Sequence, residues 1–156
     1  MAKATTAVEK AENTKSQADV DAAKTLVNAL TGQVKTDLQN RLTAVQNTID
    51  VQVDKAALPL NLSFKQGQGA TTDTPELVLP TTGANGTTIT WGTASINRIN
   101  VTTGEVNRPS FYSSDVTVTL TATISKGEAV TTQNFKVVIP RERLTGSNGA
   151  VTATKE

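Results

Sequence analysis

The sequence contains no cysteine and no histidine. These two absences exclude disulfide bonds, thiolate nucleophiles, zinc fingers, Ser-His-Asp triads and metal sites built on imidazole. No apolar run approaches the roughly 20 residues that span a bilayer. The 15 basic and 14 acidic residues nearly cancel, so bulk charge attracts neither nucleic acid nor an anionic membrane. Residues 1–6 also lack the apolar segment of a signal peptide, so we expect no export by that route.

The composition changes near residue 57 of the 156. Residues 1–56 contain no aromatic residue, no proline and one glycine, whereas all five prolines and 20 of the 28 threonines come later. Alanine-rich sequence favours helix, while threonine, valine and aromatic residues favour strands. We therefore expect an α + β protein in separate parts. Helices occupy residues 1–56, an all-β domain occupies residues 57–140, and residues 141–156 form a flexible C-terminal tail. The alternative for residues 150–153 is a strand added to a sheet edge, either that of the chain itself or that of a neighbour.

Apolar side chains recur at helical spacing in three segments of the first part. The first stripe is thin and comprises Ala4, Val8 and Ala11. The second follows Ser16 and Asp19, which match a capping box, and comprises Val20, Ala23, Val27 and Leu30, with Leu26 beside it. The third is the clearest, ends near Asp50, and comprises Val34, Leu38, Leu42, Val45 and Ile49. With a turn at Gly32, the pattern predicts a helical hairpin or a three-helix bundle.

These helices carry few large apolar side chains for their length. Ten such residues in about fifty cannot offset the conformational entropy that ordering the segment costs. We therefore expect the helices to dock on the β domain, on copies of themselves or on a larger assembly. The alternative is a marginal bundle steadied by its neighbour. The predicted docking or oligomerisation face is the third stripe, Val34, Leu38, Leu42, Val45 and Ile49.

The second part has the alternation of an antiparallel β domain. Residues 115–124 alternate apolar and polar side chains without a break, and Lys126-Gly127 predicts a turn to a partner strand at residues 130–139. Shorter strands are predicted at residues 76–79, 87–91, 97–101 and 105–107, with turns at Asn85-Gly86 and Thr103-Gly104. About seven short strands with regular turns are typical of an immunoglobulin-like sandwich, in which Trp91 would be the core aromatic residue.

Three segments of the β part resemble the bacterial immunoglobulin-like repeats of Gram-positive surface proteins and secreted enzymes. They read Leu-Pro-Thr-Thr-Gly-Ala-Asn-Gly-Thr-Thr-Ile-Thr-Trp at 79–91, Thr-Gly-Glu-Val-Asn-Arg-Pro at 103–109 and Val-Thr-Val-Thr-Leu-Thr-Ala-Thr-Ile at 116–124. Residues 7–46 resemble the helical spacer repeat of the same kind of protein. The loop at 92–97 is shorter than the Ser/Asn-rich stretch that commonly follows the tryptophan. The resemblance implies a non-catalytic spacer or display module, sometimes adhesive; similar domains decorate tailed bacteriophages.

Few side chains are candidates for binding chemistry. Phe111 and Tyr112 are adjacent, so in a strand one faces outward, where it would stack on sugar or pack on a partner; the alternative is loop packing. Asp73 and Glu76 are too few for a Ca²⁺ site, which needs six to eight oxygens. The charges at residues 141–143 are typical of a solvated edge, with a phosphate contact as the alternative. Because the carboxylates are scattered, we predict no catalytic residue, no metal and no cofactor.

The sequence therefore predicts a non-catalytic structural or display protein. The first hypothesis is a head-fibre or decoration protein on the virion surface of a tailed phage of Gram-positive bacteria. Its helices would dock on the capsid or form a homo-oligomer, and its immunoglobulin-like domain would project. The second hypothesis is a spacer or adhesion fragment of a bacterial cell-surface protein. The third is a weak carbohydrate-binding module that uses Phe111 or Tyr112 on a cell-surface glycan. Neither a nucleic acid nor a membrane is predicted as a partner.

Overall fold

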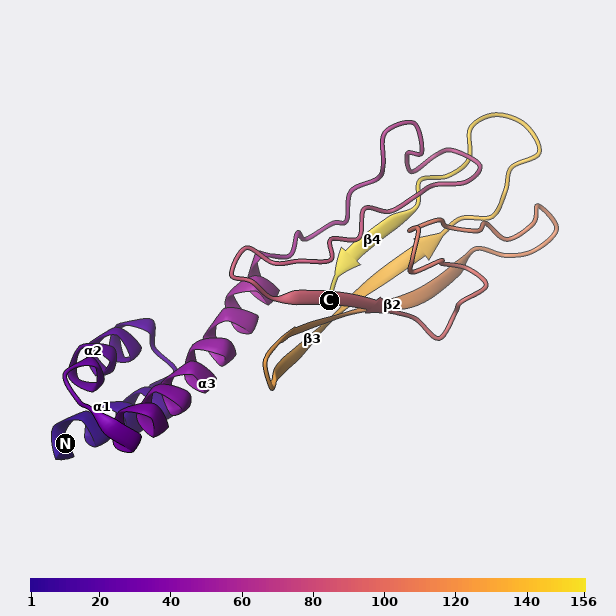
Figure 1. Ribbon diagram of the computed structural model, residues 1–156. Helices are drawn as coiled ribbons and strands as arrows, with labels where there is room; N and C mark the ends of the chain where they lie inside the picture. The colour runs from indigo at the N-terminus through magenta and orange to yellow at the C-terminus, as the bar shows by residue number, and fades with distance from the viewer.

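Three helices precede four strands in the computed structural model, which describes all of residues 1–156. The elements are α1 (Ala2–Thr14), α2 (Gln17–Asn28), α3 (Gly32–Ala57), β1 (Thr88–Gly92), β2 (Val116–Lys126), β3 (Ala129–Ile139) and β4 (Thr152–Lys155). The molecule is elongated, with α1 and α2 at one end, the sheet at the other and α3 joining the two (Figure 1). The prediction of a helical part followed by a β domain is confirmed.

The helical end is a three-helix bundle with a small core of its own. α1 and α2 each contribute a buried stripe, and the first half of α3 contributes the third. The buried cluster comprises Ala4, Val8, Ala11, Val20, Ala23, Val27, Leu38, Leu42 and Val45. Arg41 of α3 donates two hydrogen bonds of 2.8 Å to the Glu12 carboxylate of α1, which ties the two helices together. The stripes expected in the first two helices are therefore confirmed.

The expected capping box at the start of α2 is not formed. Ser16 occupies the N-cap position, but its side chain makes no capping hydrogen bond. The Asp19 carboxylate instead binds α1. It accepts a hydrogen bond of 2.7 Å from the Thr14 hydroxyl and forms an ion pair of 2.8 Å with Lys10. The acidic residue of the pattern thus fastens α2 to α1, because these two donors lie within its reach.

α3 is longer than the sequence pattern predicts, and it ends at Ala57 instead of near Asp50. The helix stops because Leu58 precedes Pro59, and a residue before proline is driven to extended backbone; Leu58 has φ −59° and ψ 138°. Val51 and Leu58 belong to the hydrophobic core of the β domain. The division between the two cores therefore falls inside α3, so that a single helix takes part in both.

The β domain is built on one antiparallel sheet with strand order β1-β2-β3-β4. β2 and β3 pair over all eleven residues, from Val116 opposite Ile139 to Lys126 opposite Ala129, and the predicted turn at Gly127 is confirmed. Alternate side chains of this hairpin are buried, among them Leu120 and Phe135. Trp91 packs on Phe135, with the two ring centroids 5.6 Å apart, and is only partly buried.

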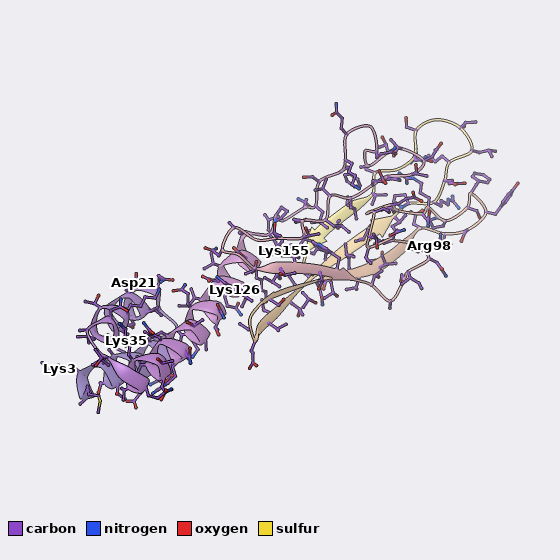
Figure 2. The ribbon with its side chains drawn as sticks, in the orientation of Figure 1. Lys3, Asp21, Lys35, Arg98, Lys126 and Lys155 are labelled. Atoms are coloured by element: carbon purple, nitrogen blue, oxygen red, sulfur yellow. The ribbon has the colours of Figure 1, made fainter.

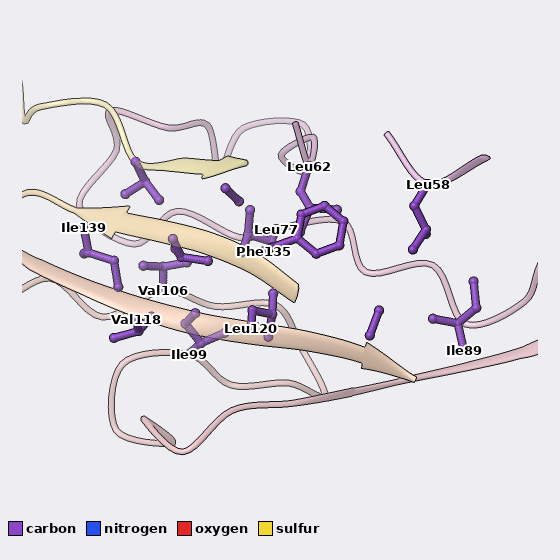
Figure 3. Close-up of a cluster of buried hydrophobic side chains, with 14 of the residues drawn as sticks. Leu58, Leu62, Leu77, Ile89, Ile99, Val106, Val118, Leu120, Phe135 and Ile139 are labelled. Atoms are coloured by element: carbon purple, nitrogen blue, oxygen red, sulfur yellow. The ribbon is translucent and has the colours of Figure 1, made fainter. Parts of the chain in front are cut away.

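Opposite the sheet, the expected short strands do not form a second regular sheet. The segments predicted as strands at 76–79, 97–101 and 105–107 are connected only by isolated bridges, such as Ile99 with Val106 and Glu76 with Glu105. Leu77, Ile99 and Val106 of these segments are nevertheless buried against the sheet (Figure 3), together with Leu62 from the chain that precedes them. This irregular layer is therefore packed on the sheet but lacks the continuous hydrogen-bond ladders of a second sheet.

The C-terminal segment ends in a strand of the chain's own sheet, which is the alternative given for residues 150–153, and not in a flexible tail. β4 pairs with β3 from Phe135 opposite Lys155 to Val138 opposite Thr152. Val151 and Ala153 are buried in the core. In a strand, alternate side chains point to the same face of the sheet. Because Val151 and Ala153 are both apolar and buried, this segment packs on the core and pairs with the edge of β3 that β2 leaves free. β4 runs back toward α3, where Lys155 lies near the helix end (Figure 2).

Lys155 caps the C-terminal end of α3, and its removal is expected to weaken the fold. Its ammonium group donates hydrogen bonds of 3.0 to 3.3 Å to the carbonyls of Lys55, Ala56 and Leu58. Such terminal carbonyls lack partners within the helix and attract positive charge. We expect Lys155→Met to lower the free energy of unfolding by about 1–2 kcal/mol in urea denaturation. Lys136→Met, at an exposed position on β3, is the control; equal losses would contradict the capping role.

Candidate functional site

The junction between α3 and the β domain is built around one buried carboxylate. Asp54 lies on the face of α3 that also carries Val51 and Leu58, and it is only 3% exposed. It accepts hydrogen bonds from the Asn85 backbone N–H at 3.1 Å, the Asn85 side-chain amide at 2.7 Å and the Thr87 hydroxyl at 2.6 Å. One carboxylate thereby fixes the turn before β1 to the side of the helix.

Two opposing effects act on the pKa of Asp54. Burial is the largest single effect and raises the pKa, but the hydrogen bonds from Thr87 and Asn85, together with the charge of Lys126, outweigh it. The net pKa lies below its usual value, so Asp54 is ionised at neutral pH. An ionised group whose acceptor sites are already bound suits a structural role and does not suit general acid or base catalysis.

A second contact reinforces the junction on the hairpin side. Lys126, at the end of β2, forms an ion pair of 2.6 Å with Asp50 of α3 and donates a hydrogen bond of 2.8 Å to the Asn85 carbonyl (Figure 2). At Gly83, an added Cβ would collide with Asp54 and Thr87, so the close approach there requires glycine. We call the set of Asp50, Asp54, Asn85, Thr87 and Lys126 the latch.

A second group of side chains lies at the opposite end of the β domain. The β2–β3 hairpin reaches the latch at Lys126, and its other end is the Val116–Ile139 pair, roughly 33 Å away at 3.3 Å per residue. The loops that adjoin this pair enclose a groove of about 500 Å³. We call it the loop-end groove, and it is lined by Phe111, Asp115, Pro140, Arg141, Glu142, Arg143, Leu144 and Thr145.

Arg141 organises the loop-end groove. Its backbone N–H donates a hydrogen bond of 2.9 Å to the Asp115 carboxylate, and its guanidinium donates one of 3.1 Å to the Ser113 carbonyl. The guanidinium carbon lies 5.9 Å from the centroid of the Phe111 ring, within the range of a cation–π contact. Two segments separated by about thirty residues are thereby joined into one surface.

Tyr112 is the most exposed aromatic residue, since 92% of its surface is accessible. Its ring stands edge-on to Phe111, with centroids 5.3 Å apart and an interplanar angle of 78°. Phe111 is partly buried, and both residues lie in a turn and not in the strand that the inward-and-outward expectation assumed.

Because Tyr112 supports little of the fold, its truncation is expected to be almost silent for stability. We expect Tyr112→Ala to change the free energy of unfolding by no more than about 0.5 kcal/mol. Thermal denaturation followed by circular dichroism measures this. A loss above about 2 kcal/mol would show that the ring packs on the domain.

The residues predicted as a docking face are mostly internal. Leu38, Leu42 and Val45 are covered by α1 and α2, which supply the apolar partners that the stripe needs. Ile49 is partly buried, and Val34 alone remains more than a third exposed, at 37%. The stripe therefore cannot serve a partner as a whole unless the bundle opens.

The remaining candidate residues take structural roles. Asp73 accepts a hydrogen bond of 2.7 Å from the Asn148 side chain, and Glu76 forms a backbone bridge with Glu105. Groups of three or more histidine, cysteine, aspartate or glutamate residues suited to a metal are absent. No helix combines the length and the apolarity needed to cross a membrane.

Two residues central to the structure, Asp54 and Arg108, were not singled out from the sequence. Asp54 had a detectable signal, because Val51, Asp54 and Leu58 continue the helical spacing past Asp50. Arg108 is 7% exposed and binds three backbone carbonyls, which no local pattern indicates.

One comparison with known proteins gives a match. A family model described as the atrophied bacterial Ig domain matches residues 51–142, which is more than half of the chain. The matched range begins inside α3, so it includes Asp54 and Leu58 as well as strands β1, β2 and β3. Domains of this family are typically non-catalytic. No curated protein matches the chain.

Proposed function

Because the chain belongs to the family of atrophied bacterial Ig domains, we propose that it is a non-catalytic structural protein. In this role it displays one end of its β domain. In this proposal the helical bundle attaches to a larger body, and the loop-end groove points away from that body. The irregular layer opposite the sheet serves as the second layer of an immunoglobulin-like sandwich.

The observation that carries the proposal is the continuity of α3. Its 26 residues, about 39 Å of helix, run from the bundle core into the core of the β domain. The latch fixes the helix at two points on the β domain, and Lys155 binds its end. α1 and α2 pack beside the first half of α3, at the end of the molecule that lies away from the sheet (Figure 1). A rod of this kind holds the loop-end groove at a distance from whatever binds the bundle.

The body that we propose as the support is the virion of a tailed phage of Gram-positive bacteria, where the chain would act as a head-fibre or decoration protein. Because most of the α3 stripe is internal, we assign attachment to the outer surface of the bundle. Leu26 and Val34, on either side of the α2–α3 turn, leave 39% and 37% of their surfaces exposed. Attachment through these residues would join the bundle to the capsid or to copies of itself.

The alternative support is a bacterial cell surface, where the same rod would act as a spacer or adhesion module. The two alternatives predict different behaviour of the purified chain. Attachment of the bundle to copies of itself predicts an oligomer, whereas a spacer predicts a monomer at high concentration.

The experiment is light scattering on the full chain, together with a mass-spectrometric inventory of purified virions. We expect a trimer or larger species that becomes monomeric in the double variant Leu26→Asp, Val34→Asp, and we expect the chain in the virion. The matched control is Lys136→Asp, which changes charge on the sheet and leaves the bundle intact. A monomer at every concentration, with no chain in the virion, would overturn the proposal.

A further inference from the structure

We infer that the loop-end groove binds a neutral oligosaccharide, with Tyr112 as the stacking platform and Arg141 as the polar contact. This inference rests on the proposed function, because it names the ligand class of the end that the rod displays. It begins from the exposure of Tyr112, a flat ring that leaves 92% of its surface in water and contacts Phe111, which lines the groove.

Tyr112 lies in a turn that contacts from neighbouring residues hold in place. Arg141 holds both sequence neighbours of Tyr112, because it lies over the Phe111 ring and donates to the Ser113 carbonyl. The Ser113 N–H also donates a hydrogen bond of 2.9 Å to the Ser110 carbonyl, which closes the turn. A turn backbone held in this way loses little further freedom when a ligand binds, and such preorganisation favours affinity.

The polar groups of the groove suit hydroxyl ligands. The Arg141 guanidinium carries five N–H donors, and one of its nitrogens binds the Ser113 carbonyl. Asp115 uses one carboxylate oxygen for the Arg141 backbone, and the exposed Glu142 supplies a second carboxylate. Adjacent hydroxyls of a sugar both donate and accept, so they match a guanidinium beside carboxylates. The C–H face of the same sugar ring would lie on Tyr112.

Charge and size favour a neutral sugar over other ligands. Arg141 and Arg143 are balanced by Asp115 and Glu142, so the groove has no net charge to select a polyanion. Its volume of about 500 Å³ falls within the range of small-ligand sites, about 300–1,000 Å³. A protein partner would need a broad patch with an apolar centre. The exposed apolar side chain that the groove itself offers is Leu144, which is 71% exposed.

The test is an array of neutral hexose and N-acetylhexosamine oligosaccharides, followed by calorimetry on the full chain with the best array sugar. We expect binding that Tyr112→Ala and Arg141→Met each weaken at least tenfold. Tyr112→Phe, which keeps the ring, is expected to bind within threefold of the original chain. Val130→Ala, an exposed position at the latch end of the hairpin, is the matched control and should change nothing.

Several results would overturn the inference. These are the absence of array binding, binding that Tyr112→Ala leaves unchanged, and preference for a phosphate-bearing polymer over the neutral sugars. Light scattering and the virion inventory test the proposed function independently of sugar binding. They therefore distinguish the absence of array binding from a failure of the proposed function. Assembly without sugar binding refutes the glycan site alone, and sugar binding by a monomer absent from virions refutes the virion proposal alone.

Discussion

Arg108→Met is expected to lower the free energy of unfolding by about 3–5 kcal/mol. The Arg108 guanidinium donates hydrogen bonds of 2.9, 3.0 and 2.6 Å to the carbonyls of Thr72, Pro140 and Ala70. It therefore joins the loop that holds Ala70 and Thr72, next to the irregular layer, to Pro140, the residue after β3. Burial is the main effect on its pKa and lowers it, while Asp73 and Glu142 oppose the change. Methionine replaces the aliphatic stem of the side chain and leaves three carbonyls without their donor.

Urea denaturation of the full chain, followed by Trp91 fluorescence, measures this loss. The matched control is Arg143→Met, at an exposed position in the same part of the chain, which we expect to change stability by less than about 0.5 kcal/mol. Equal effects of the two substitutions would show that Arg108 does not hold the irregular layer in place.

Asp54→Ala is expected to cost about 2–4 kcal/mol, because it leaves two N–H donors and a hydroxyl at the junction without an acceptor. The loss should separate the unfolding of the bundle from that of the β domain, since the latch holds α3 against the turn before β1. Differential scanning calorimetry would then show two transitions. Asp37→Ala, on the exposed side of the same helix, should leave one transition at nearly the original temperature. A single unshifted transition in Asp54→Ala would contradict the role assigned to the latch.

The Asp54 carboxylate also makes the free energy of unfolding depend on pH. Asp54 has a folded pKa below its ordinary value of 3.8, so its contribution is fully present well above pH 3.8. That contribution decreases as the pH falls through 3.8 toward the lower folded pKa. Glu12 acts in the same direction, because the hydrogen bonds from Arg41 lower its pKa. Denaturation midpoints measured from pH 7 to pH 2 should fall less steeply in Asp54→Asn than in the original chain; parallel curves would argue against this contribution.

Regular elements could be predicted from the sequence where periodicity is local. The alternation from Val116 to Ile124 and the turn at Gly127 specify the β2–β3 hairpin without reference to the rest of the chain. The stripes of α1 and α2 are equally local. By contrast, Ile99 and Val106 have strand-like side chains but form a single bridge. Whether a ladder extends beyond one bridge depends on how the facing segments approach, which residue propensity does not specify.

The contacts that define the candidate sites join residues far apart in the chain. Asp54 meets Asn85 and Thr87 more than thirty residues later, and Arg141 meets Phe111 thirty residues earlier. Phe111 and Tyr112 could be singled out because they are adjacent aromatic residues in a sequence with few. Their arrangement under Arg141, and the burial of most of the α3 stripe, depend on how the helices and loops pack.

The most direct test of the display model is a distance measurement between the bundle and the loop end. Because the chain has no cysteine, cysteines introduced at the exposed positions Thr25 and Ser114 are the only sites for spin labels. We predict one narrow distance distribution in the full chain, which broadens when Asp54→Ala opens the latch. A broad distribution before that substitution would contradict the rigid connection through α3.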